Sequence, residues 1–80
     1  MKRLQELEPG DQFYVFEFIR LVKDNLMKKL YIGESEAESL IDNSLFRELI
    51  EDDPEFVLHH GTTYWVEEII SEQEDIFQYI

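Results

Sequence analysis

Cysteine is absent from this chain of 80 residues, and glycine and proline are scarce, with three and two copies. Without cysteine there is no disulfide bond, thiolate metal site or cysteine nucleophile, which fits a reducing compartment. The three glycines are isolated from one another, so no phosphate-binding loop or dinucleotide fingerprint is present. No apolar run approaches the ~18 residues of a membrane span, and the N-terminus lacks the apolar core of a signal peptide. These absences predict a cytoplasmic protein with no membrane contact.

Basic residues are also few, with seven Lys and Arg against 19 Asp and Glu, and the net charge is −12. The imbalance begins after residue 30. Residues 1–30 carry six basic and five acidic residues, whereas residues 31–80 carry Arg47 alone against fourteen acids. Nucleic-acid affinity comes largely from cations that meet phosphates, so the second part of the chain should repel nucleic acid. The acidic surface either keeps the protein soluble or binds a partner with a basic surface.

Apolar residues make up 44% of the chain and include six Phe and four Tyr, which is enough for a real core. The length predicts one small domain, residues 1–80, with residues 1–10 free to fray. The clearest helix covers residues 13–30. Its apolar residues recur at steps of three and four: Val15, Ile19, Val22, Leu26 and Leu30.

The ends of this first helix carry their own signals. Pro9-Gly10 predicts a break before it, Asp11 suits an N-cap, and Gly33 predicts its end. The same helix carries three more aromatic residues than its single apolar face can bury: Phe13, Tyr14 and Phe16. We expect one or two of them to cover the N-terminal segment or to form a dimer contact.

Two shorter helices are predicted next. Ser35 and Glu38 match a capping box at the start of the second helix. Asn43 or Ser44 can cap a third helix that ends at Asp52. Because apolar residues lie in helical register across both segments, the alternative is one unbroken helix; we expect two.

The stretch before the C-terminus predicts a β-hairpin. Residues 56–58 and 63–66 are rich in aromatic and β-branched residues, and His60-Gly61 between them offers a tight reversal. Alternation along the second strand would place Trp65 opposite the inward face, exposed to solvent. A C-terminal helix should then cover residues 67–80.

Three helices followed by a two-stranded wing resemble the winged-helix variant of the helix-turn-helix fold, over roughly residues 13–67. The predicted fold class is therefore α+β: a three-helix, winged-helix-like domain with one β-hairpin and a C-terminal helix. The resemblance implies that the third helix and the wing would read DNA. Here the third helix has Arg47 as its only cation, and the wing, residues 59–63, has no Lys or Arg. The chain is thus more similar to winged-helix domains that bind proteins.

No motif in the chain points to catalysis. His59 and His60 are adjacent, and adjacent strand residues face opposite ways, so the two do not readily serve one site. Neither has partners at a recognised metal-ligand spacing. The serines lie in caps or acidic helices without an evident His partner. We therefore predict no enzymatic activity, no metal and no cofactor.

The remaining interpretation is a protein-interaction module or small regulator that binds a basic protein surface. In a stronger form it mimics DNA, with carboxylates where the partner reserves room for phosphates. The predicted partner-binding residues are Glu48, Glu51, Asp52, Asp53 and Trp65. Acids at a helix C-terminus oppose the helix dipole, and an exposed Trp is a common interface anchor.

Two further expectations concern partners. A homodimer is compatible with the surplus of aromatic residues. The alternative function is a nucleic-acid-binding winged-helix regulator that uses the basic residues of the better balanced N-terminal part: Arg20, Lys23, Lys28 and Lys29.

Overall fold

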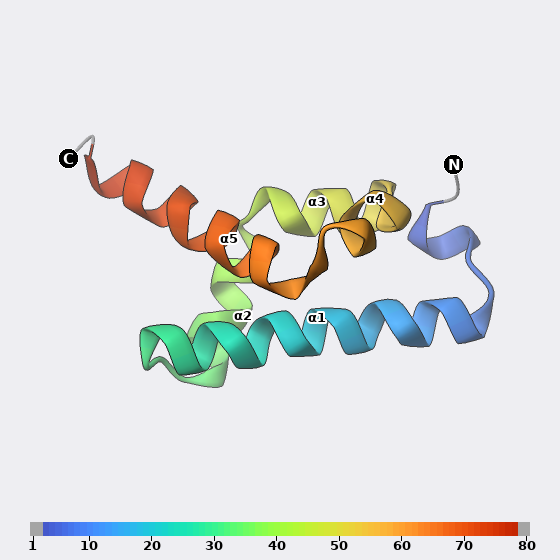
Figure 1. Ribbon diagram of the computed structural model, residues 1–80, viewed down its shortest axis with the longest axis horizontal. Coiled ribbons are helices and arrows are strands. Elements are labelled where there is room, and N and C mark those ends of the chain that lie inside the picture. Colours follow the sequence, from blue (N-terminus) through green and yellow to red (C-terminus); the bar gives the residue numbers. More distant parts are fainter. Residues whose placement is uncertain (1–2, 79–80) are drawn as a thin grey trace.

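A computed structural model describes residues 3–78, with side chains as far as Gln73, and every element in this range is helical (Figure 1). In chain order the elements are a 3-10 turn, η1 (Leu4–Glu6), and the α-helices α1 (Pro9–Leu30), α2 (Glu34–Asp42), α3 (Leu45–Asp52), α4 (Pro54–His59) and α5 (Gly61–Gln78). Residues 3–78 contain no β-strand. The predicted α+β, winged-helix-like fold with a β-hairpin is therefore wrong.

Helix α1 begins earlier than predicted. Pro9 occupies its first position, where the missing N–H leaves no hydrogen bond unmade, and Glu8 rather than Asp11 is the N-cap. Pro9 and the glycine after it are thus part of the helix and not a break. The helix ends at Leu30, and its C-cap Tyr31 adopts a left-handed conformation with φ 55° and ψ 46°. Gly33, expected to end α1, is instead the N-cap of α2.

Helices α2 and α3 are separate, as expected. Ser44 makes the corner between them: it is buried, and its hydroxyl donates to the carbonyl oxygen of Ile41 at 2.6 Å. Ser44 is also the N-cap residue of α3, one of the two predicted caps. The predicted capping box at Ser35 is not used, because α2 already begins at Glu34.

Helices α4 and α5 occupy the stretch predicted to be the hairpin. Pro54 is the first residue of α4, and the Asp53 carboxylate accepts the backbone N–H of Phe56 at 3.3 Å. An acid followed by proline is a good helix start, so this pair begins a helix as well as ending one. Gly61 has a φ of +76°, a conformation that glycine adopts readily, and it separates two helices instead of closing a hairpin.

Helix α5 begins at Gly61, earlier than the predicted start at residue 67, while residues 79–80 lie outside the described range. The reason is a helical spacing of buried side chains. Trp65, Val66 and Ile69 are all buried and lie on one face of a helix. The strand propensity of this segment was outweighed by tertiary packing of that face, because propensity for strands depends on context.

The core collects apolar side chains from all five helices: Val15, Phe18, Val22, Leu26, Ala37, Ile41, Phe46, Ile50, Val57, Trp65, Val66 and Ile69. Phe46 is at its centre. The Phe46 ring stacks on that of Trp65 at a centroid distance of 5.5 Å and meets Phe18 edge-on at 6.3 Å. Helix α1 packs against α2 and α5, and α3 packs against α4. Figure 1 shows α1 along one side of the domain and α3 with α4 along the other.

The N-terminal segment packs against α3, where fraying was expected. Leu4 and Leu7 are partly buried against the core, and the Gln12 side chain donates to the carbonyl oxygen of Leu4 at 3.3 Å. The segment does not cover the surplus aromatics, which all stay more than half exposed: Phe13, Tyr14 and Phe16. Among residues 3–78, no helix combines the length and the apolar character needed to cross a membrane.

Candidate protein-binding surfaces

Three of the four predicted acidic residues lie on α3 and form what we call the α3 acidic face: Glu48, Glu51 and Asp52, all exposed. Glu51 pairs with Arg47 one turn away at 3.3 Å, and Asp52 pairs with Arg3 at 3.1 Å. Both pairs are open to solvent, where an ion pair contributes about 0–1 kcal/mol. These cations therefore hold the carboxylates only weakly, and a partner's basic side chains can replace them.

Asp53, the fourth predicted acid, has a structural role. It is half-buried, and its carboxylate caps α4 through the backbone N–H of Phe56. An N-cap of this kind contributes about 0.5–2 kcal/mol to stability. Asp53 is therefore distinct from the α3 acidic face, although it follows that face directly in the chain.

Trp65 is buried, with 3% of its surface exposed, so the prediction of an exposed aromatic anchor is wrong. Its indole N–H donates to the carbonyl oxygen of Val57 at 2.7 Å, and its ring stacks on Phe46. The prediction failed because it placed Trp65 on a strand, where alternate residues face outward. On a helix, Trp65 lies on the same face as Ile69 and points into the core.

Glu72 of α5 extends the acidic surface and was missed by the sequence reasoning. Its carboxylate accepts the backbone N–H of Leu45, at the start of α3, at 3.3 Å. Burial raises the pKa of Glu72 above its ordinary value, and the nearby Glu68 and Glu48 carboxylates raise it further, while the hydrogen bond from Leu45 lowers it. Glu72 thus connects the acidic side chains of α5 with those of α3.

The adjacent histidines lie at the corner between α4 and α5. The His60 ring is 4.7 Å from the rings of both Phe56 and Tyr64, and its Nδ1 is 3.0 Å from the carbonyl oxygen of Phe56. His60 therefore helps to pack this corner. Within the part of the chain that the structure describes, no group of three or more His, Cys, Asp or Glu residues could hold a metal ion.

Two of the basic residues proposed for nucleic-acid binding are held in ion pairs. The Arg20 guanidinium lies 2.8 Å from Glu17 and 3.4 Å from Asp24. The Lys23 ammonium bridges α1 to α2, at 3.1 Å from Glu34 and 3.4 Å from Glu38. The hydrogen bond to Glu17 raises the pKa of Arg20, and the hydrogen bond to Glu34 raises that of Lys23. Both cations are thus neutralised by acids of the same domain.

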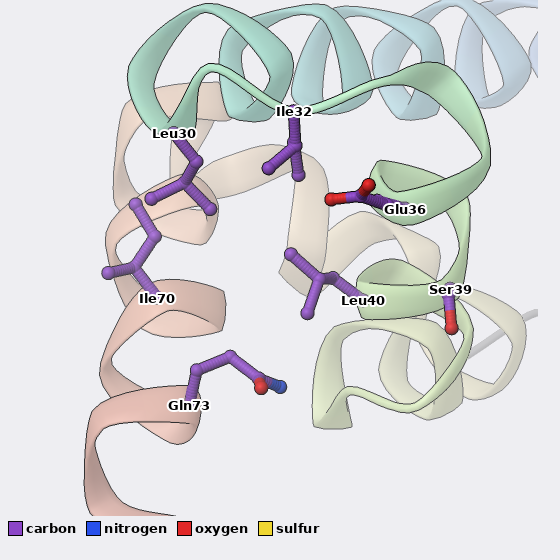
Figure 2. A pocket seen from close by; sticks show the side chains of 7 residues that line it. All are labelled: Leu30, Ile32, Glu36, Ser39, Leu40, Ile70 and Gln73. Atoms are coloured by element: carbon purple, nitrogen blue, oxygen red, sulfur yellow. The ribbon is translucent and has the colours of Figure 1, made fainter. Parts of the chain in front are cut away.

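An open apolar groove of about 580 Å³ lies where the end of α1, α2 and α5 meet (Figure 2). We call it the α1–α2–α5 groove. Four partly buried aliphatic residues and three polar residues line it: Leu30, Ile32, Leu40 and Ile70, with Glu36, Ser39 and Gln73. The sequence reasoning did not find this groove, because its walls come from three elements whose packing was not predicted.

The described surface thus offers an acidic face on α3 and an apolar groove between α1, α2 and α5. Charge complementarity and a hydrophobic centre are both properties of protein interfaces. Comparisons of the chain with protein-family models, with curated proteins and with solved structures gave no match.

Proposed function

We propose that this protein is a non-enzymatic interaction module or small regulator that binds a basic surface of another protein through the α3 acidic face. One observation carries the proposal: Glu48, Glu51 and Asp52 are exposed on one short helix. Glu51 and Asp52 lie at the C-terminal end of α3, where each acid opposes the helix dipole at a cost of about 0.3–1 kcal/mol. Residues that cost stability without packing against anything often serve function.

The charge of the whole chain supports the same proposal. Residues 31–80 carry fourteen acids against Arg47 alone, so the field around α3 is strongly negative. Such a field speeds the encounter with a cationic partner and discriminates against acidic ones. Binding through this face should therefore weaken as salt is added. In the stronger form of the proposal, the face mimics DNA and competes with duplex DNA for the partner.

The test compares capture of the partner by two variants that carry the same change in charge. The first variant reverses the α3 acidic face: Glu48→Lys, Glu51→Lys and Asp52→Lys. The matched control reverses three other exposed acids: Glu6→Lys, Glu8→Lys and Glu55→Lys. Asp53 is left unchanged in both variants because it caps α4.

Each variant is immobilised on a resin and incubated with a lysate of the native host. The captured proteins are then identified by mass spectrometry. The main partner of the wild type should be lost with the α3 variant and kept with the control. The purified partner should then bind more weakly at higher salt. If duplex DNA displaces the chain from this partner, the interaction is DNA mimicry. If the α3 variant still captures the partner as well as the control does, the acidic face only confers solubility.

The alternative function, a nucleic-acid-binding winged helix, loses its structural basis. The residues expected to form the wing, 59–63, end α4 and begin α5. Arg20 and Lys23 of its proposed basic surface are paired with carboxylates of α1 and α2. Lys28 and Lys29 are exposed in the last turn of α1, but the described fold provides no wing to act with them.

A further inference from the structure

We propose that the α1–α2–α5 groove is a second binding site, which holds one amphipathic helix of a partner protein. The helix would present a row of aliphatic side chains to the groove and a Lys or Arg to the carboxylate of Glu36. This inference rests on the proposed function only in taking the occupant to be a protein. The groove and the α3 acidic face are lined by different residues, so each can bind or fail to bind alone.

The walls of the groove suit aliphatic side chains. Leu30, Ile32, Leu40 and Ile70 are each partly buried, so each has one side packed on the core and another side open to the groove. In Figure 2 the side chains of Ile32 and Leu40 point toward the middle of the space. The volume of about 580 Å³ falls within the range of protein ligand sites, ~300–1,000 Å³. An apolar helix face would remove these side chains from water, which is favourable at about 25 cal/mol per Å².

The negative charge of Glu36 in the groove indicates that the bound helix carries a Lys or Arg there. Glu36 is the charged residue among those that line it, and its carboxylate projects toward the space between the aliphatic walls (Figure 2). Its neighbours Glu34 and Glu38 on α2 both pair with Lys23, which spans from α1. Glu36 makes no ion pair with any residue that the structure describes. A cation on the incoming helix would supply the missing partner, because Lys23, the cation on this side of α2, is already shared by Glu34 and Glu38.

The shape of the site favours a helix over a compact molecule. Helix α1 ends at Leu30, whereas α5 continues beyond the groove to Gln78 and diverges from α1 (Figure 1). The groove itself is open to solvent and not an enclosed cavity, so an elongated ligand can lie in it and extend from it. Laying an amphipathic helix into an apolar groove is a common mode of peptide recognition, with anchors at i, i+3, i+4 and i+7.

A second copy of this chain fits the groove less well than a basic partner does. Each copy carries a net charge of −12, and like charges across an interface are unfavourable. The N-terminal part has the most cations, but Arg20 and Lys23 are held by acids. The exposed Lys28 and Lys29 lie at the end of α1, next to the groove residue Leu30 itself. The occupant of this groove is thus a helix with a positive rather than a negative charge.

Tyr31 is an exposed aromatic residue that adjoins the groove in the sequence. It lies between the lining residues Leu30 and Ile32, and 94% of its surface is exposed. Its left-handed backbone is the conformation that commonly ends a helix, and glycine adopts it more readily than other residues do. Exposed tyrosines are favoured in interfaces, so Tyr31 is included in the test.

The test uses a synthetic peptide of the stated chemistry. The probe is an Ala-based helix of about 16 residues with Leu at i, i+3, i+4 and i+7 and Lys beside this row. A control peptide has Glu in place of each Lys. Calorimetry at physiological salt measures binding to the full chain, and NMR shifts of backbone amides locate the site. Circular dichroism checks that each variant is folded.

Three variants test separate parts of the groove. Leu40→Glu places a charge among the aliphatic walls, Glu36→Lys reverses the charge, and Tyr31→Gly removes the exposed aromatic ring while suiting the left-handed backbone. The matched control for charge is Glu55→Lys, on exposed α4 surface. We expect each groove variant to weaken the Lys peptide by about tenfold, and Glu55→Lys to change its affinity by less than about twofold. The Lys variant of the α3 acidic face should also bind this peptide as the wild type does.

Three results would overturn the proposal. One is that the Lys peptide does not bind, or shifts amides outside the groove. Another is that the Glu peptide binds equally well, which would remove the role of Glu36. The last is that the chain sediments as a dimer that Leu40→Glu converts to a monomer, since the occupant would then be a second copy. The two proposals can fail separately. Capture of the host partner by the α3 variant tests the proposed function, whereas binding of the Lys peptide tests the groove.

Discussion

At the scale of single residues, Leu26 shows how the inner stripe of α1 holds the domain together. Its side chain is fully buried, as predicted, whereas Leu21 on the same helix is 46% exposed. Truncating a buried Leu removes packing and leaves a cavity, at a cost of about 2–5 kcal/mol. Leu26→Ala should therefore lower the free energy of unfolding by this amount, and Leu21→Ala should change it by less than about 0.5 kcal/mol. Urea unfolding followed by circular dichroism measures both. Equal effects of the two substitutions would contradict the assigned core.

Glu72 gives a prediction about pH at the same scale. Burial raises its pKa above the ordinary value of 4.5, so the folded state binds this proton more tightly than the unfolded state. The resulting contribution to stability is complete below the unfolded pKa and is lost as pH rises through the folded pKa. Glu72→Gln keeps an oxygen for the Leu45 N–H without the charge, so it should be more stable than wild type at neutral pH. The difference should vanish as pH falls below the ordinary value.

The control for this prediction is Glu72→Ala, which loses both the charge and the acceptor for the start of α3. It should be less stable than Glu72→Gln at every pH, because the Leu45 N–H would lose its partner. Unfolding midpoints in urea across a range of pH values measure the three proteins. A Gln variant that is less stable than wild type by the same amount at every pH would show that the charge of Glu72 is not disfavoured.

At the scale of elements, the sequence predicted the first three helices and the C-terminal helix from residue 67, but it missed α4 and the start of α5. The stripe from Val15 to Leu30 has a clear helical period, and Ser44 marked the start of α3 correctly. Residues 56–58 are a short apolar run, which periodicity alone does not assign to a strand or a helix. The decisive evidence is the packing of α4 against α5: Val57 is buried, and its carbonyl oxygen accepts the Trp65 indole N–H. Contacts of this kind exist only once the helices have packed.

Gly61 sets the geometry of the corner between α4 and α5, and it carries the prediction for this scale. Its φ of +76° is unfavourable for any residue with a Cβ, whereas no atom would obstruct the Cβ itself. Gly61→Ala should therefore destabilise the fold by about 1–2 kcal/mol through backbone strain alone. Gly10 in α1 has equal space and a helical conformation, so Gly10→Ala should be neutral or stabilise by up to about 1 kcal/mol. Opposite shifts in unfolding midpoint would confirm this, while two similar shifts would contradict it.

At the scale of the whole molecule, composition predicted the acidic surface better than it predicted individual sites. The exposure of Glu48, Glu51 and Asp52 follows from acidic residues on a short helix that buries Phe46 and Ile50 on its other face. The cap at Asp53, the burial of Trp65 and the apolar groove all depend on where α4 and α5 pack. Sequence pattern alone did not reveal that arrangement, because the same residues also fit a hairpin.

The net charge of −12 gives the last prediction. Carboxylates crowded on a small surface repel one another and destabilise the compact state, and salt screens this repulsion with a Debye length of about 10 Å at 0.1 M. The urea midpoint of the wild type should therefore rise as NaCl is added at neutral pH. Each Glu or Asp to Lys change adds two positive charges, so the Lys variant of the α3 acidic face has a net charge of −6. Its midpoint should rise less over the same range of salt.

The same charge should prevent binding to duplex DNA. In a fluorescence-anisotropy titration at physiological salt, the wild type should leave labelled DNA unbound, because the chain has a net charge of −12 and two of its four candidate DNA-binding cations, Arg20 and Lys23, are paired with acids. The matched Lys variants separate two reasons for this result. If the α3 variant alone gains DNA affinity, then the α3 acidic face itself repels the DNA phosphates. This result is expected if the charge of that face acts locally, as binding of a basic partner there requires. If the Glu6, Glu8 and Glu55 control gains as much, only the total charge matters. If the wild type itself binds tightly, the charge argument fails.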